Sequence, residues 1–149
     1  MTKTVNNQTP RNKIMTKIQE TRYKQIPMTN NQSPNKHKFD LKERTTEFAR
    51  KVIRLGKKLP RNPINDRLVG QVTGSSGSIG VNYREANDAL GKKDFIHSLK
   101  IARREAKETS HWLILLKVAN PEKEKEFQDL IEEANEYKNI FSSIIQKSQ

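Results

Sequence analysis

The sequence contains no cysteine, few aromatic residues (6%), and only six glycines and six prolines among 149 residues. The absence of cysteine excludes disulfide bonds and thiolate metal sites. The longest apolar run, from Trp112 to Leu116, is too short to cross a bilayer, and the first residues lack the apolar segment of a secretion signal. We therefore expect a soluble, cytoplasmic protein that does not enter the membrane.

Acidic residues are scarce relative to basic ones. The chain has 29 Lys and Arg against 17 Asp and Glu, which gives a formal net charge of +12. Such a charge favours an anionic partner without naming it. Residues 1–38 hold eight basic residues, one acid, ten Asn or Gln and three Pro. Because apolar residues are sparse there, we interpret 1–38 as a disordered basic tail.

Residues 39–149 show the apolar periodicity of helices and no period-two alternation. The predicted helices span about 40–58, 63–90, 92–119 and 121–147. Asp40 is a predicted N-cap, Pro60 ends the first helix, and the pairs Asn62-Pro63 and Asn120-Pro121 start the second and fourth. Short connections between four helices predict an all-α fold, namely an antiparallel up-down four-helix bundle.

Residues 74–81 read GSSGSIGV, a composition typical of phosphate-binding loops and flexible linkers. A Walker loop requires a lysine directly after its last glycine, whereas the next lysine here is Lys92. Other glycine loops that bind dinucleotides or nucleic acids require neighbouring strands, which the pattern does not predict. The helical step of the apolar residues continues through this stretch, so we predict that it lies inside the second helix.

Three glycines of this helix, Gly70, Gly74 and Gly77, fall with Val81 on one side, opposite its large apolar residues. Each glycine inside a helix costs about 1 kcal/mol relative to alanine. We therefore predict close packing of this side against another helix or another subunit, with a strained, frayed helix as the alternative. A polar residue in the core register, here Asn82, can fix register or oligomeric state. The predicted packing or subunit-interface residues are Gly70, Gly74, Gly77, Val81, Asn82 and Tyr83.

The chain contains, in this order, the segments SGSIGVNYREA at 76–86, KDFIH at 93–97, EAKET at 105–109 and WL at 112–113. Together these segments resemble the bacterial four-helix-bundle proteins of the 23S rRNA intervening-sequence family. The resemblance extends over about 39–147. It implies a small antiparallel bundle that assembles into a homopentamer, and genes often located within insertions in bacterial 23S rRNA. It brings no established catalytic residue. Gly91 stands where the family often has a serine that could cap the next helix.

Two acid-x-x-His pairs, Asp94–His97 and Glu108–His111, have the spacing of di-metal bundle sites. Both lie on the third predicted helix, about 21 Å apart at 1.5 Å per residue, so they cannot share a metal within one chain. We interpret them as ordinary polar pairs. The serines have no local His–acid partners, and no cysteine nucleophile exists. We expect no metal, no cofactor, no catalytic residue and no enzymatic activity.

Basic residues are the main functional signal, because they recur at helical spacing on the first and third helices. Repeated positive patches bind phosphate backbones without reading sequence. The alternative is a solvated charged surface that only maintains solubility. Aromatic residues lie mostly in the core register, so we expect no base-stacking platform. The predicted nucleic-acid-binding residues are Arg50, Arg54, Lys57, Arg61, Lys93, Lys100, Arg103, Arg104 and Lys107.

The leading hypothesis is a non-enzymatic, oligomeric helical-bundle protein that associates with RNA or rRNA through these basic patches. Its partners are then further copies of itself, five in all by the resemblance, and RNA. The alternative is a scaffold or accessory module that binds another protein and has no direct nucleic-acid role. A small-molecule or metal enzyme is a third hypothesis, which the sequence favours least.

Overall fold

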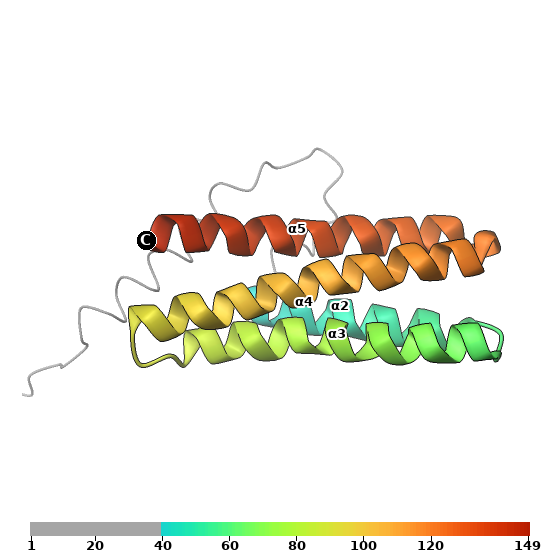
Figure 1. Cartoon of the computed structure of the whole chain (residues 1–149), viewed down its shortest axis with the longest axis horizontal. Coiled ribbons are helices and arrows are strands. Elements are labelled where there is room, and N and C mark those ends of the chain that lie inside the picture. The colour runs from blue at the N-terminus through green and yellow to red at the C-terminus, as the bar shows by residue number, and fades with distance from the viewer. Residues whose placement is uncertain (1–39) are drawn as a thin grey trace, which may run out of the picture.

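The computed structural model describes residues 40–149, and the predicted tail at 1–38 lies outside the described residues. Four α-helices and no strand occur within 40–149. The helices are α2 (Leu41–Lys58), α3 (Pro63–Asn87), α4 (Lys92–Ala119) and α5 (Glu124–Ser148), and the 3-10 turn η1 (Pro121–Lys123) precedes α5. Successive helices run in opposite directions (Figure 1). The predicted all-α four-helix bundle is confirmed.

Local signals explain where these helices begin. The carboxylate of Asp40 accepts the backbone N–H three residues later at 2.9 Å, and the side-chain oxygen of Asn62 does the same at 2.8 Å. Both are N-caps, which satisfy one of the unpaired donors at a helix start. Gly91 provides no side-chain cap, yet its extended backbone leads directly into α4 at Lys92.

Helix α3 ends earlier than the sequence predicts, at Asn87 rather than near residue 90. The N–H of Asp88 bonds to the carbonyls of Arg84 and Glu85, at 3.1 and 3.2 Å, so the last turn tightens toward i,i−3 bonding. Ala89 continues the apolar step of the sequence but lies in the connection. Periodicity therefore extends beyond the helix itself.

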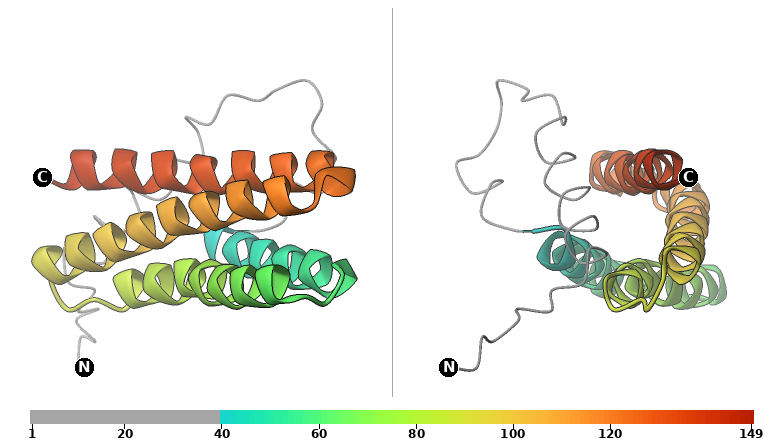
Figure 2. Two further views of the ribbon diagram at one scale, coloured as in Figure 1. Left: turned by 45° about the vertical axis from the view of Figure 1, so that its right-hand side comes forward. Right: turned by 90° about the vertical axis from the view of Figure 1, so that its left-hand side faces the viewer.

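The helices enclose one core, with α4 packed along both α3 and α5 (Figure 2). Phe48, Ile79, Leu99 and Phe141, one from each helix, are fully buried. A cluster of aromatic rings includes Phe48 and Tyr137, whose centroids lie 5.3 Å apart in an edge-to-face arrangement. Burial of such large side chains is the main stabilising contribution to the bundle. No helix within residues 40–149 is long and apolar enough to span a membrane.

Contacts between α2 and α5 include a polar cluster. Tyr137 is buried, and its hydroxyl lies 2.9 Å from a carboxylate oxygen of Glu133 and 3.0 Å from the carbonyl of Arg44. The guanidinium of Arg44 contacts Glu136 at 2.8 Å and lies 5.0 Å above the Tyr137 ring. Burial, reinforced by Glu133, raises the pKa of Tyr137 above its ordinary value. The cluster thus keeps a neutral phenol available as a donor between the two helices.

A buried amide pair connects the start of α3 to the end of α4. Asn65 and Asn120 exchange two hydrogen bonds, at 2.9 and 3.0 Å. Asn65 also donates to the carbonyl of Pro60, and Asn120 to that of Leu116. Because both amides are buried and mutually satisfied, they fix one end of the bundle at little desolvation cost.

Candidate nucleic-acid interface

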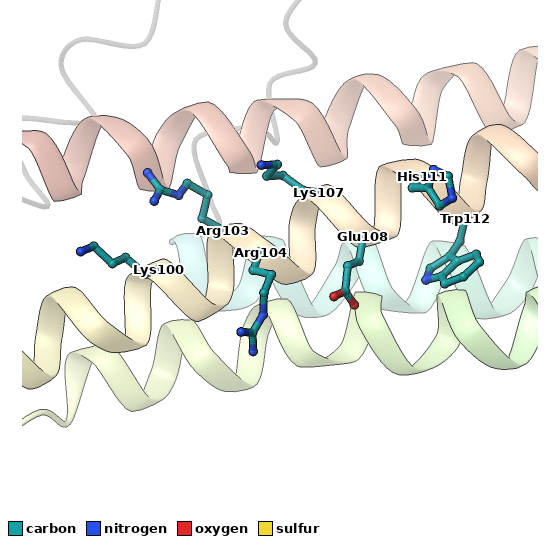
Figure 3. Close-up of a pocket in the computed structure, with 7 residues that line it drawn as sticks. All are labelled: Lys100, Arg103, Arg104, Lys107, Glu108, His111 and Trp112. Atoms are coloured by element: carbon teal, nitrogen blue, oxygen red, sulfur yellow. The ribbon is translucent and has the colours of Figure 1, made fainter.

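The outward face of α4 presents a dense group of cations. The core stripe of this helix, from Phe95 to Leu116, occupies its inner side, and the charged residues on the opposite side are exposed or half-buried. Figure 3 shows two rows of side chains on α4, one directed toward α5 and one directed toward α3. The residues of the two rows line an open groove of about 380 Å³ and are Lys100, Arg103, Arg104, Lys107, Glu108, His111 and Trp112.

These cations have few partners among residues 40–149. Lys93, Lys100, Arg103, Arg104 and Lys107 form no ion pair with another residue of 40–149. Arg103 is half-buried and donates a long hydrogen bond of 3.5 Å to the Ser142 hydroxyl on α5. Their positive charge therefore remains available to an external anion.

Two glutamates interrupt this positive surface. Glu108 is exposed and lines the groove, whereas Glu105 is half-buried beside it. Burial, followed by the charge of Glu108, raises the pKa of Glu105 above its ordinary value, and Arg104 opposes this shift. Of the acidic residues of α4, Glu108 is the one that lines the groove.

The predicted cations of α2 are arranged differently. Arg50 and Arg54 both bind the carboxylate of Glu47, at 3.2 and 2.8 Å, and Arg61 binds Asp66 at 2.7 Å. Hydrogen bonds from Arg54 and then Arg50 hold the pKa of Glu47 below its usual value. Lys57 is exposed and forms no ion pair within residues 40–149. Three of these four cations are thus paired, and the two carboxylates involved, Glu47 of α2 and Asp66 of α3, offset about half of their charge.

The structure does not join the nine predicted cations into one surface. α2 and α4 lie on different flanks of α3 (Figure 2), so their outward faces point away from each other. The five cations of α4 share one helix face, whereas the four of α2 and its following turn lie elsewhere. A single phosphate backbone segment can follow either row but cannot lie along both at once.

Sequence reasoning did not include His111 and Trp112 in this site. Their rings lie 5.2 Å apart at 63°, and the two residues end the two rows of side chains that line the groove. Trp112 is half-buried against the core and also lines the groove. The sequence did contain a pattern that could have placed both residues beside the cations. His111 follows Lys107, and Trp112 follows Glu108, at the i,i+4 spacing of one helix face.

The GSSGSIGV stretch lies inside α3, as predicted, and its glycines divide into two groups. A Cβ on Gly80 would lie 3.0 Å from the Thr45 hydroxyl of α2, so this glycine permits close helix contact. Gly70, Gly74 and Gly77 have no such neighbour within 4 Å among the described residues. The bare side of α3, by which we mean these three glycines and Val81, is therefore not covered by another helix of residues 40–149.

The other predicted interface residues occupy different positions. Val81 is 59% exposed on the bare side, whereas Tyr83 is only 4% exposed and stacks on Phe141 in the core. The amide of Asn82 donates to the carbonyl of Ser78 in its own helix at 2.8 Å. An open groove of about 710 Å³ lies between α2 and α3 beside Gly70.

The acid-x-x-His pairs lie along α4 as the sequence indicates. His97 and His111 are both exposed on this helix. Within residues 40–149, no group of three His, Asp or Glu side chains has an arrangement that could hold a metal ion.

Comparison with known proteins agrees with this architecture. The profile of the 23S rRNA-intervening sequence protein family matches residues 37–143. The chain is also similar to a crystal structure described as a protein of unknown function from the S23 ribosomal protein family of Bacteroides thetaiotaomicron. That likeness has 33% identity and a TM-score of 0.62, and it covers 70% of this chain and 94% of the other. A search among curated proteins finds no match. With the profile match spanning most of the described helices, the chain belongs to the 23S rRNA-intervening sequence protein family.

Proposed function

We propose that this protein is a non-enzymatic, self-associating bundle that binds the phosphate backbone of RNA through the outward face of α4. The observation that carries the proposal is the group of five cations on that face, none of which is ion-paired within residues 40–149. Such a face gains affinity by releasing counterions from phosphates. The rRNA context of the family makes RNA the first anion to test, and the proposal entails a cytoplasmic location.

The direct test measures the affinity of the full chain for a labelled 23S rRNA fragment at several salt concentrations. Backbone binding through four or five cations predicts that log K falls linearly with log salt, with a slope of roughly −3 to −5. An affinity that does not change with salt would exclude this mode of binding.

A pair of charge variants locates the interface. Replacement of Lys100, Arg103, Arg104 and Lys107 by Gln is expected to reduce the salt slope by about three to four and the affinity at low salt by about 100-fold. The matched control replaces Arg50, Arg54, Lys57 and Arg61 by Gln. It is expected to lose much less affinity, because three of these four cations already have carboxylate partners. Equal losses in the two variants, or a loss only when 1–38 are removed, would contradict the assignment to α4.

Self-association is the second part of the proposal. The bare side of α3 lacks a partner within the described residues although its glycines reduce helix propensity, and a second copy is the simplest compensation. Val81, exposed on the same side, would be buried by such a contact. The family resemblance suggests five subunits. Light scattering of the full chain, with and without RNA, should give a multiple of the chain mass, and a strictly monomeric protein would rule this part out.

One observation favours the alternative scaffold function. Ile114, Leu115 and Val118 are 46%, 37% and 77% exposed on the last turns of α4, beyond the cations. Exposed apolar residues grouped on one helix face are typical of protein contacts. If the protein is a scaffold, a nuclease-treated pull-down from the native host recovers a stoichiometric protein, and Val118→Lys abolishes that capture. Retention of the partner by Val118→Lys would remove this support.

A further inference from the structure

The groove on α4 combines cations with the single tryptophan of the chain, Trp112. We infer that this groove binds single-stranded RNA, with one unpaired base stacked on the Trp112 indole and the adjoining phosphates on Lys100, Arg103, Arg104 and Lys107. The inference rests on the proposed function and specifies which form of RNA the face recognises. It departs from the expectation that the chain has no base-stacking platform, and the experiment below decides between the two.

The position of Trp112 suits it to stacking. Trp112 is half-buried, packs against the core and also lines the groove, so its side chain is restrained but not fully covered by residues 40–149. Its ring is directed toward α3 (Figure 3). The His111 ring meets it at 63° with centroids 5.2 Å apart, which leaves the two rings crossed rather than stacked on each other. A pre-positioned aromatic face loses little side-chain entropy when a base stacks on it.

The charges along the groove orient the strand. From Lys100 to Trp112 the helix rises by about 18 Å, which accommodates a segment of a few nucleotides. The cations occupy the first part of this length, and Glu108 lies between Arg104 and Trp112 (Figure 3). Because a carboxylate repels phosphate, the backbone is held on the cationic part and a base, not a phosphate, approaches Trp112.

Duplex RNA fits these features less well. In a duplex each base face is covered by the next base pair, and the major groove of A-form RNA is too deep and narrow for side chains to read. The outward face of a helix can still meet the phosphates of a duplex, but Trp112 would then have no base to stack on. Unpaired nucleotides satisfy the cations and the indole together.

The single tryptophan makes the inference testable in the unmodified full chain. A short uridine oligomer is expected to quench Trp112 fluorescence on binding, because base stacking perturbs the indole directly. Inorganic polyphosphate, which has the charge but no bases, is expected to bind without that quenching, as is a short RNA duplex. Equal quenching by polyphosphate or by the duplex, or binding of the oligomer without quenching, would overturn the inference while leaving backbone binding intact. If neither RNA nor polyphosphate binds, the proposed function itself fails.

Two variants complete the test. Trp112→Leu is expected to weaken uridine-oligomer binding about tenfold while leaving polyphosphate binding unchanged. Trp112→Phe keeps an aromatic face and should retain most of the oligomer affinity. Because Trp112 also contacts the core, circular dichroism must show an intact bundle in each variant. An equal loss of affinity for both ligands, or none in folded Trp112→Leu, would contradict stacking.

Discussion

The cation rows of α2 and α4 differ in what surrounds them. On α2, Arg50 and Arg54 share the carboxylate of Glu47, and just after it Arg61 binds Asp66. The row on α4 forms no ion pair within residues 40–149. An arginine that is already paired gains less from a phosphate, because the existing pair must be broken first. The number of cations is therefore a weaker guide to an anion site than the number without a carboxylate partner.

The glycines divide in a similar way, into those with a close neighbour within residues 40–149 and those without one. Gly56 and Gly80 each lie against a side chain of the neighbouring helix, where an added Cβ would come within 3.2 Å of Val69 or 3.0 Å of Thr45. The three glycines on the bare side of α3 have open space around them among the described residues. Glycines of the first kind are explained by contacts within residues 40–149, whereas those of the second kind have no such contact there, and the proposed self-association would account for them.

The largest effect is expected from placing leucine at one glycine of each kind. Gly80→Leu should reduce the free energy of unfolding by about 3 kcal/mol, because the larger side chain overpacks the contact with Thr45. Gly74→Leu should leave the folded chain intact and instead reduce the mass observed by light scattering. Urea unfolding and light scattering separate the two outcomes. Similar destabilisation by both variants, with no change in mass, would remove the distinction between the two kinds of glycine.

Alanine gives a smaller effect of opposite sign. In dilute, dissociated protein, Gly74→Ala should raise the free energy of unfolding by about 1 kcal/mol, because alanine favours the helix and its methyl group meets no neighbour. Gly80→Ala should give no comparable gain, since its methyl group would crowd Thr45. Urea titrations of the two variants measure this difference. A gain of the same size at Gly80 would mean that the α2–α3 contact is looser than described.

The difference in ion pairing between the cations of α2 and those of α4 can be reduced with the substitution Glu47→Gln. This change releases Arg50 and Arg54 from their common carboxylate, so RNA affinity should rise, by less than about fivefold because exposed ion pairs are weak. Glu43→Gln removes the same charge without releasing an arginine and is the matched control. Both are measured by RNA titration at low salt. If the two variants behave identically, pairing on α2 does not limit its contribution.

The smallest expected effect is a pH dependence from Glu105. Because its pKa is raised in the folded chain, Glu105 takes up its proton at a higher pH than an ordinary glutamate as the solution is acidified. The ionised form is therefore destabilising in the fold, and stability should be regained as pH falls through the raised pKa. Over the same range α4 loses a negative charge, so RNA binding should strengthen by about twofold. Glu105→Gln should remove this component, and an unchanged profile in that variant would assign it to another group.

Much of the fold could be predicted because its signals are local. Asp40 and Asn62 have the side chains that cap helices, and the apolar step carried the prediction of α3 correctly through GSSGSIGV. The end of α3 at Asn87 could not be predicted in this way, because the apolar step continues through Ala89, beyond the last turn. Local patterns therefore locate helices well and their C-terminal ends less well.

The candidate site was less predictable because it depends on contacts across the chain. The sharing of Glu47 by Arg50 and Arg54 follows from helical spacing and was readable from the sequence. In contrast, the ion pair of Arg61 requires the turn between α2 and α3 to fold back. The accessibility of Trp112 depends on how far α3 and α5 cover α4 on either side. A periodic pattern assigned it no role in binding, whereas the packed helices leave part of it open.

Because α4 is held along both flanks, its backbone has little freedom to adapt (Figure 1). A ligand arriving there meets a backbone whose course is set before contact, although the Lys and Arg side chains on it can still move. If RNA binds there as proposed, main-chain adjustment falls to the nucleic acid. On this view the protein acts as a rigid template, and a pliable strand is better able to conform to it than an already stiff double helix.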